Sequence, residues 1–321
     1  MVDHSAHIAP RPTAENERAL TISGWLTGLY FFVELGIGLY TGSVAVTSDA
    51  FHTFSAVGGV VLAFVAARMA RRPANLARTF GSYRAEIIGA LLNGVFLAVM
   101  ALLVLVMGAM RLRHPIDLPT TPLLIAAAGG LITEFIAIRL LYTGQKGDLN
   151  LRGAFWHVMQ TFIGSILILV TAAVIYFTGF LTIDPILGMA FGLVLLTASW
   201  SIIRDSLSIL MEGAPPDIDL VEVAEALAKL HGARNIHHLH AWTLTSGKTV
   251  FSAHILADNS ERAGPLLEEA HRLLRDRFGF YFSTLQIETT CLDEDHVREL
   301  DISTFLQGPD IELAGVGNEP H

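Results

Sequence analysis

Charged side chains are scarce in this sequence. Asp, Glu, Lys and Arg make up 16 % of its 321 residues, whereas about 25 % is usual in soluble globular domains. The hydrophobic share is correspondingly high, at 52 %. This composition excludes an ordinary soluble domain and predicts a protein that lies mostly within a lipid bilayer.

Cysteine and net positive charge are also lacking. The single cysteine, Cys291, excludes an intrachain disulfide and leaves the redox compartment open. Acidic residues outnumber basic ones by 30 to 21 and lie mostly in residues 212–321, so no nucleic-acid partner is expected. Residues 1–19 lack the basic start and apolar core of a secretory signal. We interpret them as a polar N-terminal tail.

Long apolar runs, in contrast, are abundant. Crossing a bilayer as a helix takes about 17–25 mainly apolar residues, and Gly, Pro and charged residues separate runs of that length here. The runs are 20–41, 44–68, 84–110, 121–143, 154–178 and 186–208. They predict an all-α transmembrane domain of six helices over residues 20–212.

Basic residues are concentrated in the connection after the second run and in the connection after the fourth. Because cytoplasmic loops carry an excess of Lys and Arg, both termini are expected in the cytoplasm. Arg111 and Arg113, in the connection after the third run, go against this orientation.

A different pattern begins after residue 212. Helical periodicity and strand alternation predict elements in the order αββαβ, at residues 217–231, 235–245, 249–257, 261–278 and 283–289. This order is typical of a small α+β domain of ferredoxin-like kind. We expect it to span residues 213–295 in the cytoplasm, followed by a flexible tail over residues 296–321.

Two histidines interrupt the apolar runs. Ionisable groups inside membrane helices cost about 2.5–3.5 kcal/mol on insertion scales and are functional candidates by default. Neutral imidazole is a common ligand of divalent metals, so His52 and His157 could bind one ion between two helices. The alternative for each is a hydrogen-bonded packing residue. Asp49, three residues before His52, is a candidate third ligand.

Other acidic residues in the runs have simpler explanations. Glu34 could be satisfied between helices, and Glu86 could form a structural ion pair with Arg84 near the membrane surface.

The C-terminal domain has its own cluster of metal-ligand residue types. Alternation along the strand NIHHLHAW places His238 and His240 on one face and His237 on the other. Because imidazole and carboxylate on adjacent strands can form a zinc site, the candidate ligands are His237, His238, His240, His254 and Glu288. Cys291 and Asp293 lie close by in sequence. The alternative is a solvated polar strand face.

Several segments resemble one family, the cation diffusion facilitators. The resemblance covers about residues 20–292. It is carried by RTFGSYRAEIIGALLNGVFL (78–97), TGSVAVTSDAFH (41–52), DLNLRGAFWHV (148–158), IDPILGMAFGLVLL (183–196) and HHLHAWTLTSGKTVFSAHIL (237–256).

The resemblance implies a transporter, not an enzyme, that exports a divalent metal from the cytoplasm in exchange for protons. It implies a multi-pass homodimer in the bacterial inner membrane, with alternating access and no organic cofactor. One ion would bind between the second and fifth helices, and metal in the cytoplasmic domain would stabilise the dimer.

The sequence departs from the family pattern at the membrane site. In zinc-type members, each of the two histidines is followed four residues later by an aspartate, but Ala56 and Thr161 occupy those positions here. A dication facing only neutral imidazoles in low dielectric is strongly unfavourable. Asp49 and Glu134 are the candidates to supply the missing charge. The alternative for Glu134 is a pairing with Arg139.

The cytoplasmic site departs less from the family pattern. Phe282 stands where many relatives carry a histidine, while His237, His254, Gln286 and Glu288 fall on ligand or near-ligand positions.

Zinc is the expected ion, transported and also regulatory, because both membrane histidines remain and carboxylates have been lost. Cobalt, nickel, cadmium and copper stay open. The alternative function is a non-transporting, metal-responsive scaffold or partner subunit of the same family. A third reading is transport of another cation driven by protonation of Glu134.

Overall fold

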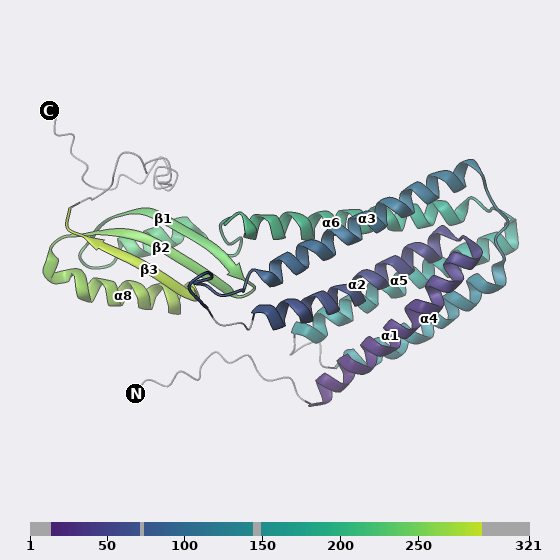
Figure 1. Ribbon diagram of the computed structural model, residues 1–321, viewed down its shortest axis with the longest axis horizontal. Helices are drawn as coiled ribbons and strands as arrows, with labels where there is room; N and C mark the ends of the chain where they lie inside the picture. The colour runs from purple at the N-terminus through teal and green to yellow at the C-terminus, as the bar shows by residue number, and fades with distance from the viewer. Residues whose placement is uncertain (1–13, 71–73, 144–148, 291–321) are drawn as a thin grey trace. The chain divides into compact units, whose positions relative to one another are not determined.

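The computed structural model describes residues 14–70, 74–143 and 149–290. Its elements are α1 (Ala14–Thr41), α2 (Val44–Ala70), α3 (Ala85–Arg113), α4 (Thr120–Leu141), α5 (Leu149–Thr178), α6 (Ile183–Leu210), α7 (Leu220–Ala228), β1 (Ala233–Thr245), β2 (Lys248–Ala257), η2 (Ser260–Arg262), α8 (Ala263–Asp276) and β3 (Phe282–Glu288) (Figure 1). They form two compact units. The helical unit comprises residues up to 66 and residues 89–203; the sheet unit comprises residues 67–88 and those from 204 onward.

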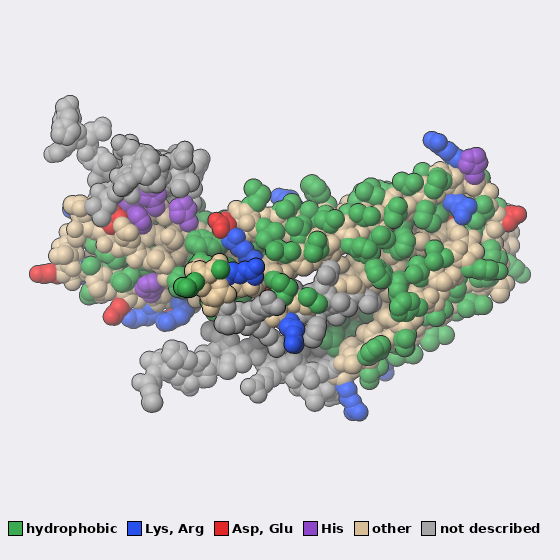
Figure 2. All heavy atoms as spheres, in the orientation of Figure 1, with side chains coloured by type: hydrophobic (Ala, Val, Ile, Leu, Met, Phe, Trp, Pro, Cys, Tyr) green, Lys and Arg blue, Asp and Glu red, His purple; other side chains and the backbone are tan. Residues whose placement is uncertain are grey.

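Five of the described helices are long and apolar enough to cross a membrane. These segments are Arg18–Thr41, Ala85–Arg113, Thr120–Leu141, Ala154–Thr178 and Ile183–Leu210. Hydrophobic side chains cover most of the visible surface of the helical unit (Figure 2), and large ones such as Phe177 are 81 % exposed. An apolar outer surface is expected where lipid takes the place of water.

Small residues bring the helices of this unit close together. A Cβ atom added at Gly94 or Gly108 of α3 would collide with side chains of α6. Ala45 and Val46 of α2 share a buried apolar cluster with residues of α4 and α5 that include Ala126 and Ile168. The second and fifth helices therefore lie in one packed core, as a site between them requires.

The sheet unit has the predicted order αββαβ. Its three strands run in the order β1-β2-β3, with β1 and β2 antiparallel and β2 and β3 parallel. Gly247, at φ 71°, makes the turn of the β1–β2 hairpin. The parallel pair needs a crossover, which α8 provides. Leu227 of α7 and Leu274 of α8 pack with Phe251 of β2 in the core.

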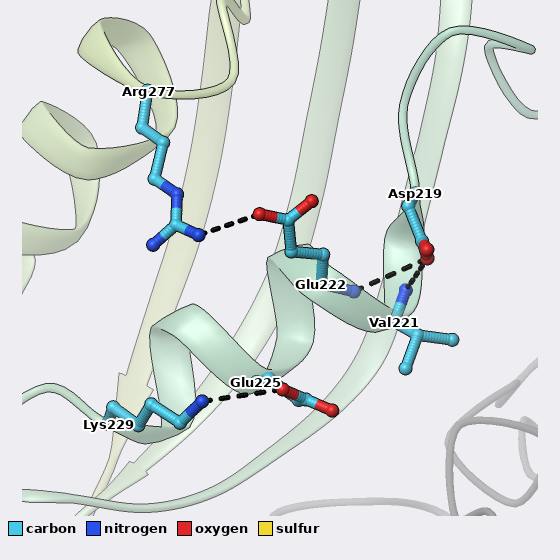
Figure 3. A network of polar contacts seen from close by, with 6 residues as sticks. All are labelled: Asp219, Val221, Glu222, Glu225, Lys229 and Arg277. Atoms are coloured by element: carbon cyan, nitrogen blue, oxygen red, sulfur yellow. Dashed lines mark hydrogen bonds and ion pairs between the residues drawn. The ribbon is translucent and has the colours of Figure 1, made fainter.

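Polar contacts fix the helices of the sheet unit (Figure 3). Asp219 caps α7 by accepting hydrogen bonds from the backbone N–H groups of Val221 at 2.9 Å and Glu222 at 3.3 Å. The Glu222 carboxylate pairs with Arg277, which follows α8, at 2.6 Å. The ion pair joins α7 to the residue that follows α8.

The segment before α3 also packs within the sheet unit. The Lys248 amine lies 3.8 Å from the ring centroid of Tyr83, and their hydrogen bond raises the pKa of the amine and lowers that of the phenol. Arg84 pairs with Glu212 at 2.8 Å, whereas Glu86 accepts a hydrogen bond from the Thr245 hydroxyl at 2.5 Å. The expected Arg84–Glu86 pair is therefore wrong, because each side chain has a partner distant in sequence.

Candidate metal sites

The structure brings the two membrane histidines together. The rings of His52 on α2 and His157 on α5 have centroids 4.9 Å apart. His52 is buried, and neither of its ring nitrogens has a hydrogen-bond partner; Nε2 of His157 has none either. Buried polar atoms without partners are costly and call for an explanation. A metal ion between the rings would give these nitrogens a ligand role, so the donors fit a borderline dication.

A carboxylate of α4 lies beside this pair of helices. The buried Glu134 side chain accepts a hydrogen bond from the Ser165 hydroxyl of α5 at 3.0 Å, and its other oxygen has no partner. Thr161, whose hydroxyl donates to the backbone carbonyl of Val158 at 2.9 Å, lies next to the same carboxyl group. Glu134 thus places a carboxyl group beside Thr161, the position where the family resemblance implies an aspartate.

Asp49 of α2 is buried against Gly164 of α5. Its side chain is 1 % exposed, and neither carboxyl oxygen has a hydrogen-bond partner. A Cβ atom at Gly164 would overlap this carboxylate. Only glycine therefore lets α5 approach Asp49 so closely.

Glu34 joins these acidic groups from α1. It is 2 % exposed, one of its oxygens has no partner, and its carboxyl group interacts with those of Asp49 and Glu134. The sequence signal was an acid inside an apolar run, but it did not show which helices Glu34 would face. The side chain of Ala56 lies outside the part that the structure describes.

The second site is formed by one residue from each strand of the sheet. We call His237 of β1, His254 of β2 and Glu288 of β3 the strand trio. Their ligand atoms lie within 4.8 Å of one another, and no other group of three or more His, Cys, Asp or Glu donors this close is found among the described residues. Glu288 Oε1 lies 3.0 Å from His254 Nδ1, and its Oε2 lies 3.5 Å from His237 Nε2.

Strand pairing explains the trio. His237 is paired with His254 across β1 and β2, and His254 is paired with Gln286 across β2 and β3. Gln286 donates a hydrogen bond to Glu288 Oε1 at 2.6 Å, which orients the carboxylate. The set of two imidazoles and one carboxylate fits zinc, which accepts both ligand types.

The predicted alternation of the neighbouring histidines is wrong. The register of β1 shifts between His237 and His240, and His238 has φ 46°. Such a bulge re-aims side chains, and the ring centroid of His238 lies 5.7 Å from that of His237 and 5.3 Å from that of His254. His240 is instead paired with Ser252 and is not in the trio.

Cys291, Asp293 and the predicted tail 296–321 lie outside the described residues, as do residues 1–13.

Two family descriptions together match most of the chain. "Cation efflux transmembrane domain" matches residues 20–211, and "Cation efflux protein, cytoplasmic domain" matches residues 215–290. The chain belongs to the cation diffusion facilitator family. Cation diffusion facilitators are metal efflux transporters, so this multi-pass membrane protein exports metal cations and is not an enzyme.

Individual relatives of this cation diffusion facilitator are also named as metal cation transporters. It is 35 % identical to the metal cation efflux system protein CzcD of Cupriavidus metallidurans, over 94 % of this chain and 96 % of CzcD. It is 31 % identical to a cadmium, cobalt and zinc/H(+)-K(+) antiporter of Bacillus subtilis, over 88 % and 92 % of the two chains. The zinc transporter ZitB of Escherichia coli is 29 % identical, over 89 % and 91 %.

Proposed function

We propose that this cation diffusion facilitator exports zinc from the cytoplasm across the bacterial inner membrane in exchange for protons. The observation that carries the proposal is the pair of facing imidazoles, His52 on α2 and His157 on α5, whose ring centroids are 4.9 Å apart. The names of relatives support zinc and add cadmium, cobalt and proton exchange. Nickel and copper are further candidates on ligand chemistry.

In this proposal, His52 and His157 bind the transported ion and acidic side chains compensate its charge. Glu134 is the first of these, because it lies beside Thr161 and has an oxygen without a partner. Asp49 is the second, because it is buried on the same helix as His52. Loss of one aspartate from α5 would thus be offset by a carboxylate that reaches the same place from α4.

The membrane domain, residues 20–212, then has six spans: the five long apolar helices and α2. The 27 residues of α2 (Val44–Ala70) are long enough to cross a bilayer. With both termini in the cytoplasm, residues 213–295 form a cytoplasmic domain of ferredoxin-like kind that forms the homodimer. Metal bound by the strand trio stabilises that dimer.

The test is metal flux in proteoliposomes that contain the purified full-length protein. Zinc, cadmium, cobalt, nickel and manganese are compared, with and without a proton gradient. His52→Ala and His157→Ala should each abolish zinc efflux, while His114→Ala, an exposed histidine after α3, should leave it unchanged. Normal efflux in both membrane variants would refute the site. A wild-type protein that binds zinc but moves none would be the metal-responsive scaffold instead.

A further inference from the structure

A buried carboxylate of α6 caps the start of α2. Asp184 is 1 % exposed. Its Oδ2 accepts a hydrogen bond from the Val44 backbone N–H at 2.7 Å, and its Oδ1 accepts from the Ala45 N–H at 3.3 Å. The Ser43 hydroxyl donates to Oδ1 at 2.5 Å and itself accepts from the Val46 N–H at 3.2 Å.

These bonds satisfy the first three backbone N–H groups of α2. The initial N–H groups of a helix have no partner within the helix, and a cap usually comes from the residue just before it. Here the Ser43 hydroxyl accepts only from the Val46 N–H, while the N–H groups of Val44 and Ala45 donate to a residue about 140 positions away. The negative charge also complements the positive end of the helix dipole. The start of α2 is therefore fixed to α6.

Backbone packing makes the junction tight. A Cβ atom at Gly188, one turn after Asp184, would overlap the backbone of Val44 and Ala45. Gly42, at φ 71°, makes the turn before α2, and the Arg111 guanidinium at the end of α3 lies against it and attracts Asp184.

The position of this cap sets the position of His52. His52 lies eight residues after Val44 on the same helix. If α2 slipped by one residue on its cap, it would turn by about 100° and move by about 1.5 Å. The ring centroids of His52 and His157 are 4.9 Å apart. A rotation of α2 by that angle would point the His52 ring away from His157.

We propose that Asp184 is a positioning residue for the membrane metal site: by capping α2 it holds His52 opposite His157. This inference rests on the proposed function, because it assumes that the two imidazoles bind the transported ion. It assigns Asp184 no contact with the metal.

Asp184→Asn tests the inference, since the amide keeps the shape but loses the charge and one acceptor. Full-length variants in proteoliposomes are assayed for zinc and cadmium flux as a function of metal concentration. Losing hydrogen bonds to a charged group predicts a zinc KM about 10- to 100-fold higher, with the maximal rate per folded transporter within about twofold of wild type. The ratio of the zinc and cadmium KM values should also change, because displaced imidazoles suit the two ions differently. Asp205→Asn, at an exposed position on α6, is the matched charge control and should change neither value.

Two further variants keep the test decisive if Asp184→Asn fails to fold. Ser43→Ala removes one contact to Asp184 and should raise the zinc KM by a smaller factor. Gly188→Ala separates α6 from α2 without touching any charge and should raise it too. Unchanged zinc KM values and an unchanged zinc-to-cadmium ratio in the folded variants would overturn the positioning role. If His52→Ala itself transports zinc normally, the proposed function fails instead, which is a different result.

Discussion

Replacing Glu134 with Gln should strongly reduce the zinc affinity of the transporter while leaving the helices folded. The side chain is buried, accepts a hydrogen bond from Ser165 at 3.0 Å, and lies beside Thr161. Glutamine has nearly the same shape, and its amide oxygen can still accept the Ser165 bond. The substitution therefore isolates the loss of one negative charge.

The magnitude follows from the cost of an unpaired buried charge. Breaking a buried ion pair by removing one partner costs about 3–5 kcal/mol, which corresponds to roughly two to four orders of magnitude in zinc affinity. Ser165→Ala keeps the charge and loses one hydrogen bond to it, which predicts a loss of about tenfold. Glu134→Gln should thus lose more zinc affinity than Ser165→Ala.

Zinc flux in proteoliposomes, measured as a function of zinc concentration, is the assay. The double variant Glu134→Gln/Thr161→Asp returns a carboxylate to the same place from α5 and should recover most of the lost affinity. A zinc KM for Glu134→Gln within about threefold of wild type would refute the reasoning, and the charge compensation would then have to come from Asp49 or Glu34.

Further outcomes are expected in the sheet unit and at the α2–α5 contact. Glu288→Gln should abolish the zinc-dependent rise in the melting temperature of the full chain, because an intact site at 100 times its Kd adds about 2.7 kcal/mol; His240→Ala should keep that rise, and the reverse ranking would disprove the strand trio. Phe251→Ala should destabilise the sheet unit by about 3–5 kcal/mol, since Phe251 is fully buried, and a change below 1 kcal/mol in chemical unfolding would contradict the core assignment. Gly164→Ala should lower zinc flux by displacing Asp49, whereas Gly24→Ala, which has open space around its α-carbon, should not; equal flux in both variants would show that the close contact is dispensable.

Hydropathy located five of the membrane helices, because burial in lipid requires long apolar runs. The predicted ends of the helices were less accurate. The apolar run 186–208 predicted a shorter helix than α6, which spans Ile183–Leu210, because polar residues such as Asp184 can also be helical. The order αββαβ was also predictable, because alternation and helical periodicity are local properties. The sequence also marked His52 and His157 as candidate ligands, since a histidine in an apolar run is unusual, and their rings lie 4.9 Å apart in the structure.

What the sequence could not show is how helices face each other. The proximity of Glu134 to Thr161, and of Glu34 to Asp49, depends on the rotation of four helices about their axes, which hydropathy does not encode. The bulge at His238 was missed because a positive φ at a histidine leaves no signature in an alternating pattern. The cap by Asp184 was missed because residues so far apart in sequence carry no local signal.

The glycine opposite Asp49 bears on how the transporter moves. Interlocked side chains resist sliding, because ridges of one helix must climb out of the grooves of the other. At Gly164, α5 presents no side chain to α2. No side chain of α5 would therefore have to be displaced at this point if α5 shifted along α2, whereas the start of α2 stays fixed to α6 by the Asp184 cap.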